Sequence, residues 1–206
     1  MLTKKQLSIF GAFLGNIFIE YSHKELKSLS REKSNNAFHI AIQEFKKENL
    51  MKERKIGTSK LYTLNTENEF VYHYLSIVAQ SKLPKQAYEE IKLLKRELEK
   101  YDLFYSLVVF GSYANNTYKK DSDLDIAIIV QDNSKEKDIK IALNSVNNKA
   151  LIKIDAHIIT IGEFLEMLKA DYENLGKEIA RKNFPIHNIN IFYKIIKKGI
   201  ENGFRY

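Results

Sequence analysis

The feature of this sequence that most restricts its fold is an acidic pair between two apolar runs. The segment "YSLVVFGS" ends at Gly111 and Ser112, ten residues follow, and "DLDIAIIV" then supplies Asp123 and Asp125 where a second apolar run begins. Ionised carboxylates are costly to bury unless they are paired or bind a metal ion. We therefore expect two buried strands here, and a chemical role for the acids at the start of the second strand.

The spacing of the acidic residues predicts where their side chains point. Residues i and i+2 of a strand face the same side, so Asp123 and Asp125 converge and can share a divalent metal. The alternating segment "ALIKIDAHIIT" adds Asp155, which shares a face with Lys153 and His157. If this strand lies beside the Asp123/Asp125 strand, three carboxylates surround a pair of metal ions, an arrangement suited to in-line phosphoryl displacement.

The turn at Gly111 and Ser112 supplies a different kind of group. A turn that follows a strand exposes backbone N–H groups, and Ser112 adds a hydroxyl. Such groups can hold the phosphates of a metal-bound nucleotide.

Two other interpretations of the acidic segment were compared with this one. A calcium-binding loop would have acids at its positions 1, 3, 5 and 12, here Asp121, Asp123, Asp125 and Asp132. Its sixth position requires Gly, but the residue is Ile126 and "IAIIV" is typical of a strand, which disfavours this loop. The second alternative is that these Asp residues only lie in solvent at the end of a strand and bind no metal.

The combined pattern resembles the DNA polymerase β-like nucleotidyltransferases. Gly-Ser, a ten-residue gap, Asp-x-Asp within "SDLD" and a later strand Asp form the signature of that family. More narrowly, Val108 to Ile159 looks like the minimal nucleotidyltransferases, and "TIGEFLEMLKADYENLGKEIARKN" resembles their helical tail. The resemblance implies an α/β (α+β) domain over residues 101–206, with a mixed sheet flanked by helices.

The same resemblance implies a role for each residue of the signature. Gly111 and Ser112 would bind the triphosphate, Asp123 and Asp125 would bind two Mg²⁺ or Mn²⁺ ions, and Asp155 would complete the second metal site near the attacking hydroxyl. Members of the family transfer a nucleoside monophosphate from ATP or another NTP to a hydroxyl and release pyrophosphate. The resemblance therefore implies an enzyme that most plausibly transfers AMP.

One position departs from the family pattern. Many relatives have Arg-Gly after "GSYA", whereas this chain has Asn115-Asn116. Asn tolerates positive φ, so the turn can be kept, but a basic contact is missing and Lys119 or Lys120 would have to replace it. A domain that only binds or senses nucleotide, within a transcription regulator, is therefore the alternative to catalysis.

Positive charge is concentrated in the N-terminal third of the chain. The net charge of +7 divides unevenly, because residues 1–65 hold 12 Lys or Arg and 6 Asp or Glu, while the remainder holds 21 and 20. This distribution is expected of a module that binds a polyanion, joined to a nearly neutral one. The alternative is a basic surface that only keeps the protein in solution.

The order of signals in this region predicts helices followed by a hairpin. "TKKQLSIFGAFLGN" has an apolar helical face, "SHKELKSLS" begins with a capping box of Ser22 and Glu25, and Ser34 can cap "SNNAFHIAIQEFKKENL". "LMKERKIGTSKLYTLN" alternates on both sides of "GTS", which indicates a basic β-hairpin. Residues 1–66 thus resemble a winged helix-turn-helix domain.

That second resemblance implies a DNA-binding surface. Amide side chains can read adenine edges in a major groove, and cations of the wing can contact phosphates. Winged helices also serve as protein-interaction modules, which stays open. The residues expected to contact DNA are Asn36, His39, Gln43, Arg54, Lys55 and Lys60.

The remaining features concern organisation and partners. Two apolar helical patterns separated by Pro84 predict a helical connector over residues 67–100. The chain has no Cys and no apolar run near the roughly 18 residues needed to span a bilayer, so we expect a cytoplasmic protein without a membrane partner. Proteins that resemble the C-terminal domain often act as antitoxins that modify a HEPN-type partner toxin, and winged-helix proteins often form homodimers.

Overall fold

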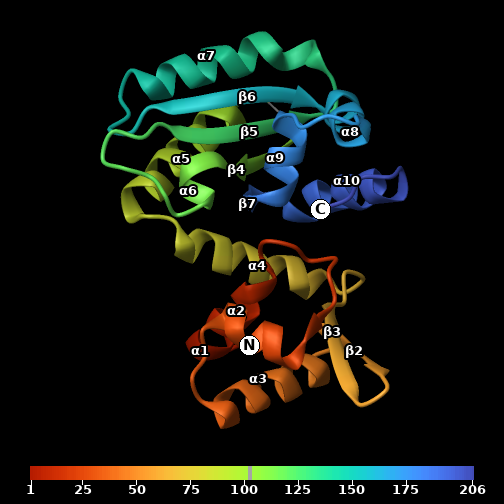
Figure 1. Ribbon diagram of the computed structural model, residues 1–206. Coiled ribbons are helices and arrows are strands. Elements are labelled where there is room, and N and C mark those ends of the chain that lie inside the picture. Colours follow the sequence, from red (N-terminus) through yellow and green to blue (C-terminus); the bar gives the residue numbers. More distant parts are fainter. Residues whose placement is uncertain (102–103) are drawn as a thin grey trace. The chain divides into compact units, whose positions relative to one another are not determined.

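The structure is a computed structural model that describes residues 1–101 and 104–206 (Figure 1). The chain divides into two units, Met1–Ala79 and Gln80–Tyr206. The boundary lies within helix α4 (Glu69–Lys82), inside the expected connector. Residues 102 and 103, which belong to the expected domain 101–206, lie outside the described residues. The two units are described separately.

The first unit begins with helices whose starts are set by side-chain caps. Ser22 and Glu25 form the predicted capping box, and the Ser34 hydroxyl accepts from the Ala37 N–H at 3.2 Å. The first helix is shorter than the apolar pattern suggested, because a 3₁₀ turn follows Phe10. The elements are α1 (Lys4–Phe10), η1 (Gly11–Phe13), α2 (His23–Ser30) and α3 (Asn35–Lys47).

A small antiparallel sheet completes this unit. The predicted hairpin is present as β2 (Met51–Ile56) and β3 (Ser59–Leu64), joined at Gly57, whose φ is +57°. The sequence did not indicate the third strand, β1 (Tyr21–Ser22), which pairs with β3 in the order β1-β3-β2. Phenylalanines fill the core between helices and sheet, and the rings of Phe10 and Phe45 lie 5.2 Å apart.

The second unit is built on a mixed four-stranded sheet of order β6-β5-β4-β7. Strand β5 pairs antiparallel with β4 and parallel with β6, while β7 pairs antiparallel with β4. Almost every residue of β4 and β5 is buried, as expected of central strands with both faces covered. The strands are β4 (Tyr105–Val109), β5 (Leu124–Val130), β6 (Ile154–Thr160) and β7 (Phe184–His187).

Two groups of helices pack around this sheet (Figure 1). Helix α5 packs against α7, and α8 packs against both α9 and α10. The expected helical tail is present as α8 and α9. The elements between and after the strands are α5 (Lys85–Leu98), η2 (Glu99–Tyr101), α6 (Gly111–Ala114), η3 (Asn133–Lys135), α7 (Glu136–Asn147), α8 (Ile161–Lys169), α9 (Leu175–Arg181) and α10 (Ile189–Glu201).

The mixed α/β fold class expected from the sequence is confirmed, with one error in the connector. The apolar pattern of the first connector helix starts at Phe70 in the sequence, but the Phe70 side chain is 65% exposed, whereas Val71 and Leu75 are buried. The buried face therefore begins at Val71 rather than at Phe70. Across residues 1–101 and 104–206, no helix combines the length and apolar character needed to cross a membrane.

Candidate active site

The pairing of β5 with β6 brings the predicted acidic residues to one end of the sheet. Asp125 lies opposite Asp155 in the parallel register. One residue earlier, the Leu124 N–H donates to the Lys153 carbonyl at 2.8 Å, which sets Asp123 beside Lys153 at the point where both strands begin. Since alternate residues of a strand share a face, these four side chains form a charged patch on one face, called here the β5–β6 patch.

Gly111 lies directly against this patch. Its φ is +61°, and a Cβ atom built on it would lie 2.1 Å from Oδ2 of Asp125, so no other residue fits without displacement. Hydrogen bonding from the Ser112 backbone also stabilises the Asp125 carboxylate. Sequence reasoning assigned this turn to phosphate binding only. The structure adds that the turn fixes the position of Asp125.

The environment of Asp125 disfavours its negative charge. Burial raises the pKa of the Asp125 carboxyl above its ordinary value, the Ser112 backbone opposes this rise, and the nearby Asp155 and Asp123 add to it. His157, whose ring centroid lies 5.6 Å from that of Phe110, lowers the same pKa. A cation bound among these carboxylates would stabilise their ionised forms.

Asp123 is engaged by the lysine of the patch. Lys153 Nζ lies 3.4 Å from Asp123 Oδ2, and the two side chains are 69% and 45% exposed. In the part of the chain that the structure describes, no three His, Cys, Asp or Glu side chains are gathered closely enough to enclose a metal ion. The donor set is nevertheless that of a Mg²⁺ or Mn²⁺ site, because hard divalent cations prefer carboxylate oxygens.

The loop between Gly111 and the acidic pair keeps its turn despite the departure from the family pattern. Asn116 adopts a φ of +56°, whereas Asn115 has a right-handed helical conformation. Asn therefore supplies the positive φ that Gly would otherwise provide. Farther along, the ring of Tyr118 stacks on Tyr113 with centroids 4.5 Å apart. Lys119 and Lys120 are exposed in this loop.

Two residues that sequence reasoning did not select fix the start of β6. The Asn147 side chain bonds both backbone groups of Ile154, at 2.9 and 3.0 Å. The buried Glu90 accepts a hydrogen bond from the Leu151 N–H at 2.8 Å. Neither role could be recognised from the local sequence. Glu90 is 61 residues from Leu151, and Asn147 reaches Ile154 across the turn between α7 and β6.

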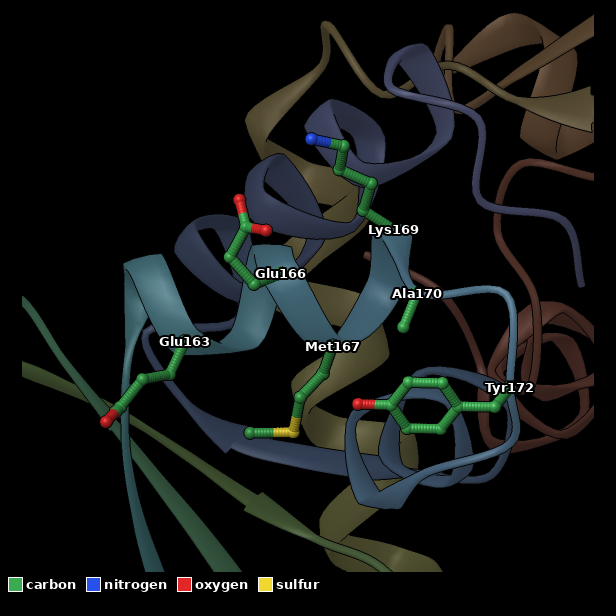
Figure 2. Close-up of a pocket in the computed structure, with 6 residues that line it drawn as sticks. All are labelled: Glu163, Glu166, Met167, Lys169, Ala170 and Tyr172. Carbon is green, nitrogen blue, oxygen red and sulfur yellow. The ribbon is translucent and has the colours of Figure 1, made fainter.

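One hollow of the second unit is separate from the β5–β6 patch. It is a groove of about 490 Å³ formed by α8 and the residues just after it (Figure 2). No carboxylate of the patch lines it, so volume alone does not locate the candidate site. Its lining residues are Glu163, Glu166, Met167, Lys169, Ala170 and Tyr172.

In the first unit, the residues expected to read DNA bases lie on one face of α3. Asn36, His39 and Gln43 are exposed, opposite the buried Phe38 and Ile42. This placement agrees with the helical period used to select them. Burial lowers the pKa of His23 beside this face, and the nearby His39, Lys27 and Lys60 lower it further.

The cations of the hairpin differ in how far they are already paired. Arg54 Nε donates to Glu20 Oε1 at 2.9 Å, and Lys60 Nζ lies 3.4 Å from Glu53 Oε1. Lys55 is exposed, and no ion pair to it is found within the described residues. Of the three, Lys55 is the cation most available to a phosphate.

Two comparisons with known proteins bear on this chain. Over 175 residues it is 26% identical to the Structural maintenance of chromosomes protein 3 homolog of Plasmodium falciparum. That alignment covers 82% of this chain but only 13% of the longer protein, so it carries no activity to this chain.

The second comparison coincides with the candidate site. Residues 91–187 match a family model described as a nucleotidyltransferase domain. The match begins within α5, ends with β7, and includes all four strands of the larger sheet as well as Gly111, Ser112 and the three acids. Residues 91–187 of this chain are therefore similar to a nucleotidyltransferase domain.

Proposed function

We propose that this protein is a divalent-metal-dependent nucleotidyltransferase that transfers AMP from ATP to a hydroxyl group. The observation that carries the proposal is the register of β5 and β6, with Asp125 opposite Asp155 and Asp123 on the same face, beside Gly111. The coarser activity, nucleotidyl transfer, agrees with the family match over residues 91–187. The choice of ATP rests on the resemblance described above.

In this proposal each residue of the site has a separate task. The Gly111 backbone and the Ser112 hydroxyl bind the triphosphate, and Gly111 also lets the backbone approach Asp125. Asp123, Asp125 and Asp155 would hold Mg²⁺ or Mn²⁺, which would neutralise phosphate charge and polarise the reacting oxygens. The acceptor oxygen bonds to the α-phosphorus as the bond to the β-phosphate oxygen breaks, pyrophosphate leaves, and the hydroxyl proton passes to a carboxylate of the patch.

We further propose that the acceptor hydroxyl belongs to a partner protein, such as a HEPN-type toxin. Asp155 is exposed, which leaves the reacting end of the site accessible to a macromolecule. Under this proposal the protein acts as the antitoxin of a pair. The alternative proposal is a regulator in which the domain binds nucleotide without turnover.

Transfer of label separates these two proposals. The full-length protein is incubated with α-³²P-labelled ATP, Mg²⁺ and the candidate acceptor, and labelled acceptor is measured. We expect Asp123→Asn and Asp125→Asn to lower the rate at least about a hundredfold, because metal ligands are lost. Asp121→Asn removes a nearby exposed carboxylate outside the patch and is the matched control. Tight ATP binding without transfer by the unmodified protein would favour the regulator.

A second proposed activity is DNA binding by a winged helix-turn-helix domain over residues 1–66. The observation that favours it is the exposed polar face of α3 beside several cations. We propose that Asn36, His39 and Gln43 contact bases, whereas Arg54, Lys55 and Lys60 contact phosphates. Binding to the protein's own promoter at several salt concentrations tests this activity.

A further inference from the structure

Lys153 has no task in the proposed chemistry, yet it contacts one of the candidate metal ligands. Its ammonium lies 3.4 Å from Asp123 Oδ2, and it is the cross-strand neighbour of that residue. The start of β6 is held by Asn147, so the backbone beneath Lys153 is fixed even though its side chain is exposed. A positive charge therefore lies beside Asp123, on a backbone segment whose position is fixed.

This ion pair is weak enough for a metal ion to replace the Lys153 ammonium at Asp123. Both partners are substantially exposed, and exposed ion pairs contribute little to stability. A divalent cation interacts with the same carboxylates through twice the charge and through direct coordination. Binding of metal is thus expected to displace the ammonium from Asp123.

The displaced ammonium would lie next to a second anion. A triphosphate bound at Gly111 and Ser112 would extend beside the β5–β6 patch, and the flexible four-carbon stem of lysine lets its charge move without backbone change. A cation near the phosphates would offset their negative charge, and the structure has one in contact with the candidate metal ligand Asp123.

We propose that Lys153 is a nucleotide-binding residue that pairs with Asp123 in the metal-free protein and moves to the nucleotide phosphates when metal binds. This inference rests on the proposed function of the same site. It assigns Lys153 two effects of opposite sign. The lysine competes with the metal before nucleotide binds, and it strengthens nucleotide binding once the metal is present.

The test measures those two effects without relying on turnover. Binding of Mn²⁺ alone to the full-length protein is followed by electron paramagnetic resonance. Binding of α,β-methylene ATP at saturating Mn²⁺ is followed by calorimetry. We expect Lys153→Met to tighten Mn²⁺ binding about threefold to tenfold, because a like charge is removed, and to weaken nucleotide binding by about tenfold. Lys153→Arg keeps the charge and should change each affinity by less than about threefold.

A matched control and the contrary outcomes complete the test. Lys137→Met removes an exposed lysine of α7, beyond the opposite end of β5, and should change neither affinity. If Lys153→Met moves both affinities in the same direction, or moves neither, the inference is overturned. If the unmodified protein binds no Mn²⁺, or Asp125→Asn binds it equally well, the proposed function fails together with the inference. Circular dichroism verifies that each variant is folded.

Discussion

At the scale of single residues, the carboxylate of Asp125 determines what can stand at position 111. A side chain there would collide with Oδ2 of Asp125, and the positive φ would strain most residues other than Gly, including alanine. We expect Gly111→Ala to lower the free energy of unfolding by about 2 kcal/mol and to abolish Mn²⁺ binding, because the Asp125 carboxylate must move. Urea denaturation and the Mn²⁺ titration measure these effects.

Gly57 provides the comparison for this substitution. It also has a positive φ, +57°, but no atom lies within 4 Å of the Cβ that alanine would add. Gly57→Ala should therefore show the cost of the backbone conformation alone and leave metal binding intact. Equal effects of the two substitutions on Mn²⁺ binding would show that contact with Asp125 is unimportant.

Residues of the candidate site were predictable where local rules apply. Strand alternation set Asp123 and Asp125 on one face, and the expectation that the strand of Asp155 lies beside theirs is confirmed by the register of β5 and β6. The ion pair of Asp123 with Lys153 was not predicted, because alternation shows only which residues share a face. The contribution of Asn147 was also missed, since it depends on how the chain turns between α7 and β6.

At the scale of elements, β7 shows where sequence patterns stop being informative. It is short and contains Pro185, and proline disfavours a central strand because it has no backbone N–H to donate. The strand forms at the edge of the sheet, where it pairs with β4. About 80 residues separate its His187 from Ser106, whose hydroxyl donates to the His187 carbonyl at 3.0 Å. Helices α8 and α9, in contrast, were expected because this segment resembles the helical tail of the family, and the structure shows that both have local side-chain caps.

The position of His187 in β7 makes this element sensitive to pH. Burial lowers the pKa of His187 below its ordinary 6.5, Lys95 lowers it further, and Glu99 opposes them. As the pH falls through 6.5, the unfolded chain takes up a proton that the folded protein does not, so stability present above pH 6.5 is lost. We expect the urea midpoint of the second unit to be lower at pH 6 than at pH 7.5.

Replacement of His187 by an aromatic residue tests this origin. His187→Phe keeps a ring beside Tyr105, whose centroid lies 4.8 Å away, but cannot be protonated. The part of the pH dependence that comes from this residue should disappear. His73→Phe, at an exposed position of α4, is the control. An unchanged pH dependence in His187→Phe would assign the effect to other groups.

At the scale of the whole molecule, positive charge is distributed unevenly along the chain. The excess of basic residues lies within residues 1–65, whereas the segment that matches the nucleotidyltransferase model, residues 91–187, falls in the nearly neutral remainder. Net charge governs association with polyanions rather than the fold, so this asymmetry concerns partners. A protein that carried DNA binding on one unit and nucleotidyl transfer on the other could regulate its own synthesis, as the proposed antitoxin role requires.

The salt dependence of DNA binding tests this division of charge. Each phosphate contacted contributes roughly −0.9 to the slope of log affinity against log salt, so three cations contribute a slope of roughly −3. Simultaneous replacement of Arg54, Lys55 and Lys60 by Ala should flatten the slope and weaken binding to all sequences alike. Asn36→Ala or Gln43→Ala should mainly reduce discrimination between the promoter and unrelated DNA. Fluorescence anisotropy on the full-length protein measures both effects.

The ion pairs of the hairpin sharpen this prediction for single variants. Arg54 is hydrogen-bonded to Glu20, and this bond must break before Arg54 can contact a phosphate, which lowers the net gain in binding free energy. Lys55 is exposed and can contact a phosphate without breaking such a bond. Lys55→Ala should therefore weaken binding more than Arg54→Ala. Glu20→Gln should strengthen binding, because it releases Arg54 and removes a negative charge. Lys137→Ala, in the other unit, is the control and should leave the slope unchanged. Salt-insensitive or undetectable binding would instead assign residues 1–66 to dimerisation or to docking of a protein partner.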